Sequence, residues 1–204
     1  MAILGIDLGT SNSAAAVAVA GVTQMIQPVE GATDEGWLFP SYVAFDINGQ
    51  PSCAGLLAKR QYHGAANLIV RHAKRLIGRS YDYISRVLEQ HPDGLSCRHS
   101  LDEFRGRLSR GDTGEVLIRV GTARQKQYAP HEIARILLEK IREDADAQVH
   151  MLHGERITQA IITVPAGFDD APLRATLWAG EEVFGKGHVR LIPEPLAAAI
   201  ASGT

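Results

Sequence analysis

The most constraining feature of this chain is a short apolar run near its start, which carries one acid and then breaks into small polar residues. The run Ala2–Leu8 is apolar apart from Asp7, and this pattern predicts a strand. The chain then returns as a second small, apolar strand, Ser13–Gly21. A glycine and three side chains with hydroxyl or amide donors lie between the two strands: Gly9, Thr10, Ser11 and Asn12. The chain must therefore place a carboxylate and several donors at one tight turn.

The chemistry of this turn favours a phosphate site. Backbone N–H groups in a tight turn can form a concavity that binds anions, and Gly9 allows the backbone to approach closely. Asp7 cannot hold a phosphate directly, because both groups are negative, so a cation has to lie between them. Mg²⁺ is typically held by one or two carboxylates, waters and phosphate oxygens. The stretch therefore predicts a phosphate loop with a magnesium anchor, although an ordinary hairpin turn favours the same residue types.

The rest of the chain indicates an α/β fold with a mixed sheet. A third strand, Val22–Pro28, continues the first two as an antiparallel meander. An apolar stripe then predicts a helix from Pro130, because apolar residues recur at every fourth position. The elements expected after it are a strand at Gln159–Pro165, a helix capped by Asp169 or Asp170 and ending near Phe184, a strand at Val189–Pro193 and a helix from Glu194. This order predicts a mixed sheet with flanking helices.

A smaller α+β insert is expected between residues 41 and 127. Its first strand is Ser41–Ile47, and two short helices are expected at Ala54–Tyr62 and Leu68–Ile77. The stretch Tyr81–Lys126 is charged and rich in glycine, and it contains one strand-like run, Glu115–Gly121.

The composition excludes some classes of partner. The chain has 204 residues, of which 45% are apolar, and a formal net charge of -2. Nucleic-acid or membrane-surface binding would need clustered positive charge, so neither is expected. The apolar runs are too short to span a bilayer, which needs roughly 20 residues. Two distant cysteines, Cys53 and Cys97, form no disulfide framework, and a reducing, cytoplasmic compartment is the simpler interpretation.

Five motifs resemble one family when they are taken together. They are "GIDLGTSNS" at 5–13, "FPSYVAF" at 39–45, "AKRLIGRS" at 73–80, "VPAGFDD" at 164–170 and "IPEPLAAAIASG" at 192–203. Their types and order resemble the heat-shock-70 chaperones of the DnaK type. The resemblance implies the first lobe of an actin-like ATPase domain with a ribonuclease-H-like sheet. Its core subdomain would comprise residues 1–40 and 128–204, and residues 41–127 would form the inserted subdomain.

The resemblance also implies roles for the residues of the first turn. The family residue that matches Asp7 orders waters around Mg²⁺. Those that match Gly9, Thr10, Ser11 and Asn12 form the phosphate loop, and Thr10 would also lie near the attacking water. The family commonly has Thr where this chain has Ser11, but the hydroxyl donor is kept.

Three further residues gain roles from the same resemblance. Lys74 matches the catalytic lysine next to the γ-phosphate, although a solvated lysine within a basic run is the plainer interpretation. Glu194 matches a residue beside the metal and the water, and an acid in the first turn of a helix is also favoured by the helix dipole. Pro165 matches the allosteric switch that reports nucleotide state, although it could simply end a strand. The family usually has Arg eight residues after that proline, where this chain has Leu173, followed by Arg174.

The implied function is part of an ATP-dependent protein-folding chaperone that binds ATP or ADP with Mg²⁺. The implied partners are unfolded client proteins, a J-domain co-chaperone and a nucleotide exchange factor. The second lobe and the peptide-binding domain of the family are not found in this sequence. We therefore expect the chain alone to be inactive as an ATPase, to bind ATP weakly or not at all, and to self-associate through its C-terminal end.

Two other functions remain open from the sequence. The first is a small-molecule kinase of the same superfamily, such as a sugar kinase, whose first turn can carry a similar glycine-rich motif. The second is an interaction module that uses only the surface of the lobe and binds no nucleotide. The lysine motif at 73–80 and the C-terminal motif at 192–203 favour the chaperone.

Overall fold

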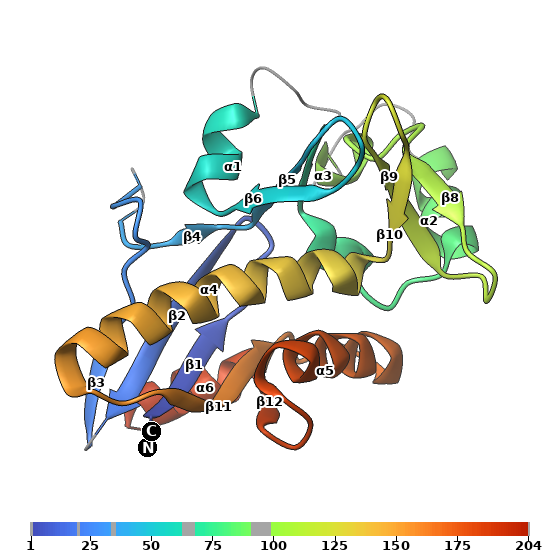
Figure 1. Cartoon of the computed structure of the whole chain (residues 1–204). Coiled ribbons are helices and arrows are strands. Elements are labelled where there is room, and N and C mark those ends of the chain that lie inside the picture. Colours follow the sequence, from blue (N-terminus) through green and yellow to red (C-terminus); the bar gives the residue numbers. More distant parts are fainter. Residues whose placement is uncertain (1, 20, 34–35, 63–67, 91–98, 204) are drawn as a thin grey trace.

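The computed structural model describes residues 2–19, 21–33, 36–62, 68–90 and 99–203 of this chain. Figure 1 shows a sheet-and-helix body at one end and a second group of short strands and helices at the other, with the long helix α4 (Pro130–His153) running beneath that second group. Cys97 lies outside the described residues.

The larger sheet combines antiparallel and parallel pairing. Its strand order is β12-β11-β1-β2-β3, with β4 also paired to β2. The first three strands form the predicted antiparallel meander, whereas β11 runs parallel to β1 and β12 runs parallel to β11. The strands are β1 (Ala2–Asp7), β2 (Asn12–Val19), β3 (Val22–Met25), β4 (Phe39–Pro40), β11 (Ile157–Val164) and β12 (Val189–Pro193). The predicted mixed sheet with flanking helices is confirmed.

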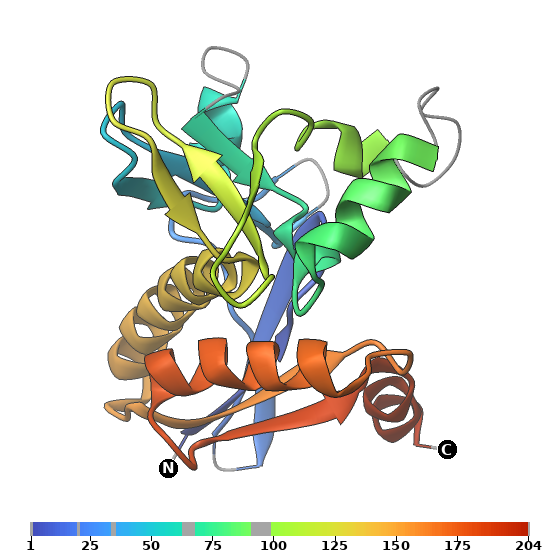
Figure 2. The ribbon, with the colours of Figure 1, turned by 90° about the vertical axis from the view of Figure 1, so that its right-hand side faces the viewer.

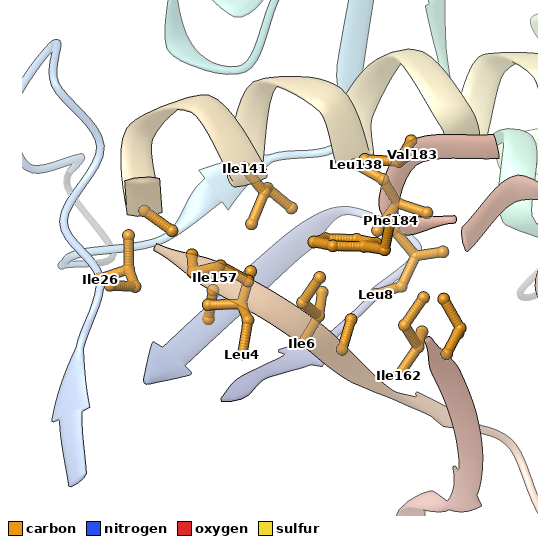
Figure 3. Close-up of a cluster of buried hydrophobic side chains, with 14 of the residues drawn as sticks. Leu4, Ile6, Leu8, Ile26, Leu138, Ile141, Ile157, Ile162, Val183 and Phe184 are labelled. Carbon is orange, nitrogen blue, oxygen red and sulfur yellow. The ribbon is translucent and has the colours of Figure 1, made fainter. Parts of the chain in front are cut away.

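Helices cover both sides of this sheet. Side chains of α4 and α5 (Asp170–Phe184) share one buried cluster with the strands, and Figure 2 shows α6 (Glu194–Ser202) on the side opposite α4. No side chain of α6 is buried. Figure 3 shows the cluster, in which Leu4 and Ile6 of β1 lie beneath Leu138 and Ile141 of α4. The predicted stripe on α4 is confirmed, because every member of it is buried: Ile133, Leu137, Ile141, Ala145 and Val149.

A second buried cluster lies among residues 43–120. It is built on two small antiparallel sheets of the described residues, with strand orders β6-β5-β7 and β10-β9-β8. Ile133 and Ile136, near the start of α4, also belong to it, so α4 contacts both clusters. The elements are β5 (Tyr42–Phe45), β6 (Pro51–Ala54), α1 (Leu56–Gln61), β7 (Ile69–Arg71), the 3₁₀ helix η2 (Ala73–Leu76), α2 (Tyr81–Gln90), α3 (His99–Asp102), β8 (Leu108–Arg110), β9 (Val116–Val120) and β10 (Lys126–Tyr128). The boundaries of the insert at residues 41 and 127 stay a prediction.

The helix expected at Leu68–Ile77 is wrong. Its first part is β7, which pairs with β5, and its second part is η2. Ile69 and Val70 are β-branched and 2% and 0% exposed, so pairing and burial in a sheet stabilise them better than a short helix would. The stretch 81–126, which the sequence left largely unassigned, contains α2, α3 and β8 in addition to the expected strand β9.

The helices of the described residues do not cross a membrane. None of them combines the length and the hydrophobicity that crossing a bilayer requires.

Candidate functional site: a polar cleft at the ends of the parallel strands

The turn between β1 and β2 is closed by its own backbone. The Gly9 N–H donates to the Asp7 carbonyl oxygen at 3.1 Å and to Ser13 Oγ at 3.2 Å. A Cβ atom at Gly9 would lie only 1.8 Å from the Asn12 carbonyl oxygen. Glycine is therefore required here by the close approach of two backbone segments.

The side chains of two serines stabilise this turn through hydrogen bonds. Ser13 is 1% exposed, and its Oγ lies 3.1 Å from Ser41 Oγ. Ser41 Oγ donates to the Gly9 carbonyl oxygen at 2.9 Å, and the Ser41 N–H donates to the Ser11 carbonyl oxygen at 2.8 Å. The turn is thus held by Ser41, which lies between β4 and β5 and is 28 residues from Ser13, a contact that was not predicted from the sequence.

Asp7 lies at the carboxyl end of three parallel strands. β1, β11 and β12 run in the same direction, so their carboxyl ends meet at one edge of the sheet. Asp7 pairs in register with Thr163 of β11, and Thr163 Oγ1 donates to Asp7 Oδ1 at 2.8 Å. Glu194 follows the last residue of β12 at the same edge. Crevices at the carboxyl ends of parallel strands are common ligand sites in open α/β sheets.

Lys74 and Glu194 form an ion pair across this edge. Lys74 Nζ lies 2.8 Å from Glu194 Oε1, although the two residues are 120 positions apart. The Lys74 side chain is 11% exposed and that of Glu194 is 41% exposed. Lys74 lies on η2, and Glu194 is the first residue of α6. The largely buried Lys74 side chain is thereby directed toward the same edge as Asp7.

These side chains line one cleft of about 550 Å³. Of the residues that the sequence singled out, the cleft brings together Asp7, Gly9, Thr10, Lys74, Pro165 and Glu194. Ser11 and Asn12 are not part of its lining. The volume falls within the range of typical ligand pockets, roughly 300–1,000 Å³.

The lining of the cleft combines charged and apolar side chains. Arg75 and Arg79, from the basic run that contains Lys74, add positive charge to that of Lys74. Arg79 Nη1 also lies 3.5 Å from Asp169 Oδ2. Asp169 stands at the N-cap position of α5, but its side chain makes no capping hydrogen bond there, contrary to the expectation from the sequence. The aromatic and aliphatic part of the lining comprises Tyr83, Ile84, Val87, Leu101 and Phe168.

Three contacts of this site were missed by sequence reasoning. Thr163 holds Asp7, and Ser13 and Ser41 hold the turn; the two serines lie within motifs but were given no role there, and Thr163 lies outside every motif. The signal for Thr163 is its place two residues before Pro165, which becomes informative only when the register of β11 against β1 is known.

The comparisons with known proteins address the whole chain. The family model described as "Hsp70 protein" matches residues 3–204. The chain belongs to the Hsp70 family. The "Chaperone protein DnaK" of Akkermansia muciniphila is 38% identical over 202 residues, which cover 98% of this chain and 28% of that protein. The "Chaperone protein DnaK" of Endomicrobium trichonymphae is 36% identical over 201 residues, which cover 98% of this chain and 25% of that protein.

Membership of the Hsp70 family agrees with the actin-like ATPase fold expected from the motifs. The chain spans about a quarter of the length of the curated relatives it matches. Both relatives are named as chaperones, so the comparisons do not favour the sugar-kinase alternative.

Proposed function

We propose that this chain forms part of an ATP-dependent protein-folding chaperone, in which its cleft holds the phosphate groups of a magnesium-bound nucleotide. The observation that carries the proposal is the convergence of Asp7, the Gly9–Thr10 turn, Lys74 and Glu194 on one cleft. These residues come from segments far apart in the sequence, and their chemical types match the needs of phosphoryl transfer.

The turn after β1 is suited to hold phosphate oxygens. Its backbone is closed by the Gly9 N–H, which donates within the turn, and is held by two serines, so the N–H groups that follow Gly9 would meet an anion from a backbone of fixed shape. The Thr10 hydroxyl lies in the cleft and can donate to a phosphate oxygen or orient a water. In this proposal Ser11 and Asn12 contribute from the rim of the turn, because they do not line the cleft itself.

Lys74 and Glu194 would act on the transferred group. An ammonium group in a largely buried position neutralises charge on phosphate oxygens more strongly than one in open water. Its pairing with Glu194 at 2.8 Å keeps it directed into the cleft before a ligand arrives. Glu194 can then orient the attacking water or a water bound to the metal.

Asp7 fits a magnesium site that is completed by ligand and water. No group of three or more His, Cys, Asp or Glu side chains within the described ranges could hold a metal by itself. Mg²⁺ commonly keeps several waters and uses one or two carboxylates with phosphate oxygens. One oxygen of Asp7 accepts the Thr163 hydrogen bond, which fixes the direction of the carboxylate. Bound Mg²⁺ would supply the positive charge that allows this carboxylate and a phosphate to share the cleft.

The same proposal covers partners and signalling. Unfolded client proteins, a J-domain co-chaperone and a nucleotide exchange factor are the expected partners of the complete chaperone. Pro165 lines the cleft at the end of β11, where it can sense the occupant. Leu173 stands where the family usually has Arg, and the neighbouring Arg174 is exposed and 3.8 Å from Asp170. We propose that Arg174 does not replace that arginine, because it points to solvent beside Asp170.

A chimera tests the proposed function. This chain would replace the matching segment of the Akkermansia muciniphila relative, and single-turnover ATP hydrolysis would be measured. Lys74→Ala should lower the rate by about a hundredfold, the effect expected of one group that stabilises transition-state charge. Lys186→Ala, which removes an exposed lysine outside the cleft, is the matched control. Equal rates for the two variants would remove Lys74 from the mechanism.

A further inference from the structure

The chain turns sharply just before Lys74. β7 ends at Arg71, η2 begins at Ala73, and His72 between them has φ 54° and ψ 18°. Among the described residues, His72 is the one residue other than glycine with a positive φ. This left-handed conformation is unfavourable for a residue with a side chain, so the surrounding structure has to hold it.

Glu103 lies between the two side chains of this corner. Its Oε2 accepts a hydrogen bond from Arg71 Nε at 2.6 Å, and its Oε1 lies 3.3 Å from His72 Nδ1. The Glu103 side chain is 11% exposed and that of His72 is 14% exposed. Four residues later, Arg107 Nη1 donates to the Ile69 carbonyl oxygen at 3.0 Å. The segment after α3 therefore contacts β7 and the corner at several points.

Arg71 is itself held on its other sides. Its Nη1 donates to the Tyr42 hydroxyl oxygen at 3.3 Å, and its guanidinium carbon lies 4.5 Å from the centre of the Tyr62 ring. Burial lowers the pKa of Arg71, but the hydrogen bonds to Tyr42 and Glu103 outweigh it and raise the pKa above its ordinary value. Arg71 is thus a fixed cation against which Glu103 is anchored.

The facing atoms of Glu103 and His72 indicate where a hydrogen has to be. Glu103 Oε1 and His72 Nδ1 are both buried, and neither has a hydrogen-bond partner within the described part of the chain. The two atoms lie 3.3 Å apart without hydrogen-bond geometry, so their contact is electrostatic, and an Nδ1 without hydrogen would present partial negative charge to the carboxylate oxygen. A hydrogen on Nδ1 turns this contact into an attraction, and histidine can carry one there in its neutral or its charged form.

We propose that Glu103 is a positioning residue, which fixes the left-handed corner at His72 and so keeps the Lys74 ammonium beside Glu194 in the cleft. The Arg71–Glu103–His72 group is called the corner clamp below. Its importance for nucleotide binding rests on the proposed function, whereas its effect on the position of Lys74 does not.

The first test substitutes the clamp in the 204-residue chain. Glu103→Gln keeps the shape but removes the negative charge, and if its oxygen keeps the Arg71 bond, its NH2 group faces His72 and can donate only to an Nδ1 without hydrogen, so the His72 tautomer has to change. We expect the NMR signals of the Lys74 side chain to shift and the dissociation constant for Mg-ATP to rise by about tenfold, because misplacing a charged group by a fraction of an ångström weakens its contacts. The matched control is Asp102→Asn, which removes the neighbouring Asp102–Arg105 pair and should change neither readout.

The second test uses His72 and does not depend on the folding of the Glu103 variant. Asn tolerates the left-handed conformation and can donate to Glu103, so His72→Asn should keep the wild-type Lys74 signals, whereas His72→Ala should lose them. In the wild-type chain, the ¹⁵N signal of His72 Nδ1 should be that of a nitrogen carrying hydrogen.

The outcomes separate this inference from the proposed function. Wild-type Lys74 signals in Glu103→Gln or in His72→Ala, or a His72 Nδ1 without hydrogen, would overturn the corner clamp. A wild-type chain whose signals respond to Mg-ATP only outside the cleft would contradict the proposed function alone, because the Lys74 and His72 signals are read without nucleotide.

Discussion

Gly9→Ala is the substitution whose effect follows most directly from the geometry of the turn. The new Cβ would lie 1.8 Å from the Asn12 carbonyl oxygen and 3.0 Å from the carbonyl carbon. A carbon and an oxygen approach no closer than about 3.3 Å without strain, so the backbone at Asn12 has to move by roughly 1.5 Å. Asn12 begins β2 and pairs with Pro40, so this movement cannot be confined to the side chains.

The size of the effect can be worked from the hydrogen bonds that this movement breaks. The Gly9 N–H to Ser13 bond and the Ser41 to Gly9 carbonyl bond both join the displaced segments. At about 1 kcal/mol each, their loss lowers the free energy of unfolding by roughly 2 kcal/mol. For a chain of this size, that loss corresponds to a fall in Tm of roughly 4–8 °C. Nucleotide binding should weaken further, because the donors of the turn lose their common direction.

The assay compares thermal and guanidinium unfolding of Gly9→Ala with that of Gly5→Ala. A Cβ at Gly5 would meet its nearest neighbour, the Ala16 carbonyl oxygen, at 3.6 Å, which is ordinary contact. Gly5→Ala in the same strand should therefore leave stability within about 1 kcal/mol of wild type, or raise it slightly. The reasoning is wrong if the two variants unfold alike and bind Mg-ATP alike.

Three further predictions address charge, protonation and surface. Asp7→Asn keeps the shape of the side chain but should remove most of the magnesium dependence of ATP binding in titration calorimetry; unchanged dependence would make the carboxylate purely structural. Burial lowers the pKa of His131, so the free energy of unfolding of the wild type should fall as the pH drops below about 6.5, the ordinary pKa of histidine. His131→Phe keeps a ring against Trp178 and should lose less stability between pH 7 and pH 5 in denaturant unfolding; equal losses would contradict this. Ile200 on α6 is 67% exposed, and burying apolar surface contributes about 25 cal/mol per Å², so Ile200→Asp should reduce self-association in analytical ultracentrifugation. Val22→Asp on β3, at a residue that is 68% exposed, should leave self-association unchanged.

The parts of the fold that depend on local periodicity could be predicted from the sequence. The apolar run that became β1 and the apolar stripe on α4 are visible in consecutive residues, because both elements bury apolar side chains in the core. The acid at the end of β1 and the glycine after it also pointed to the turn. Of the site residues expected from the motifs, all except Ser11 and Asn12 line the cleft.

The parts that depend on long-range register could not be predicted. The helix expected around Lys74 was wrong because β7 pairs with β5, and this tertiary pairing outweighs a weak local preference. The Asp7–Thr163 bond depends on a register between residues 156 positions apart. Glu103 lies in the stretch 81–126, whose irregular pattern gave no indication that one of its acids would be buried against Arg71 and His72.

The measurement that tests the central claim most directly is an NMR titration of the 204-residue chain with Mg-ATP, extended to millimolar concentration to detect weak binding. The account predicts that the largest shifts fall on the backbone amides of Gly9 and Thr10 and on the side chain of Lys74, and that inorganic triphosphate with Mg²⁺ moves the same signals. Shifts confined to residues outside this cleft would contradict the claim that the cleft at the ends of the parallel strands holds phosphate.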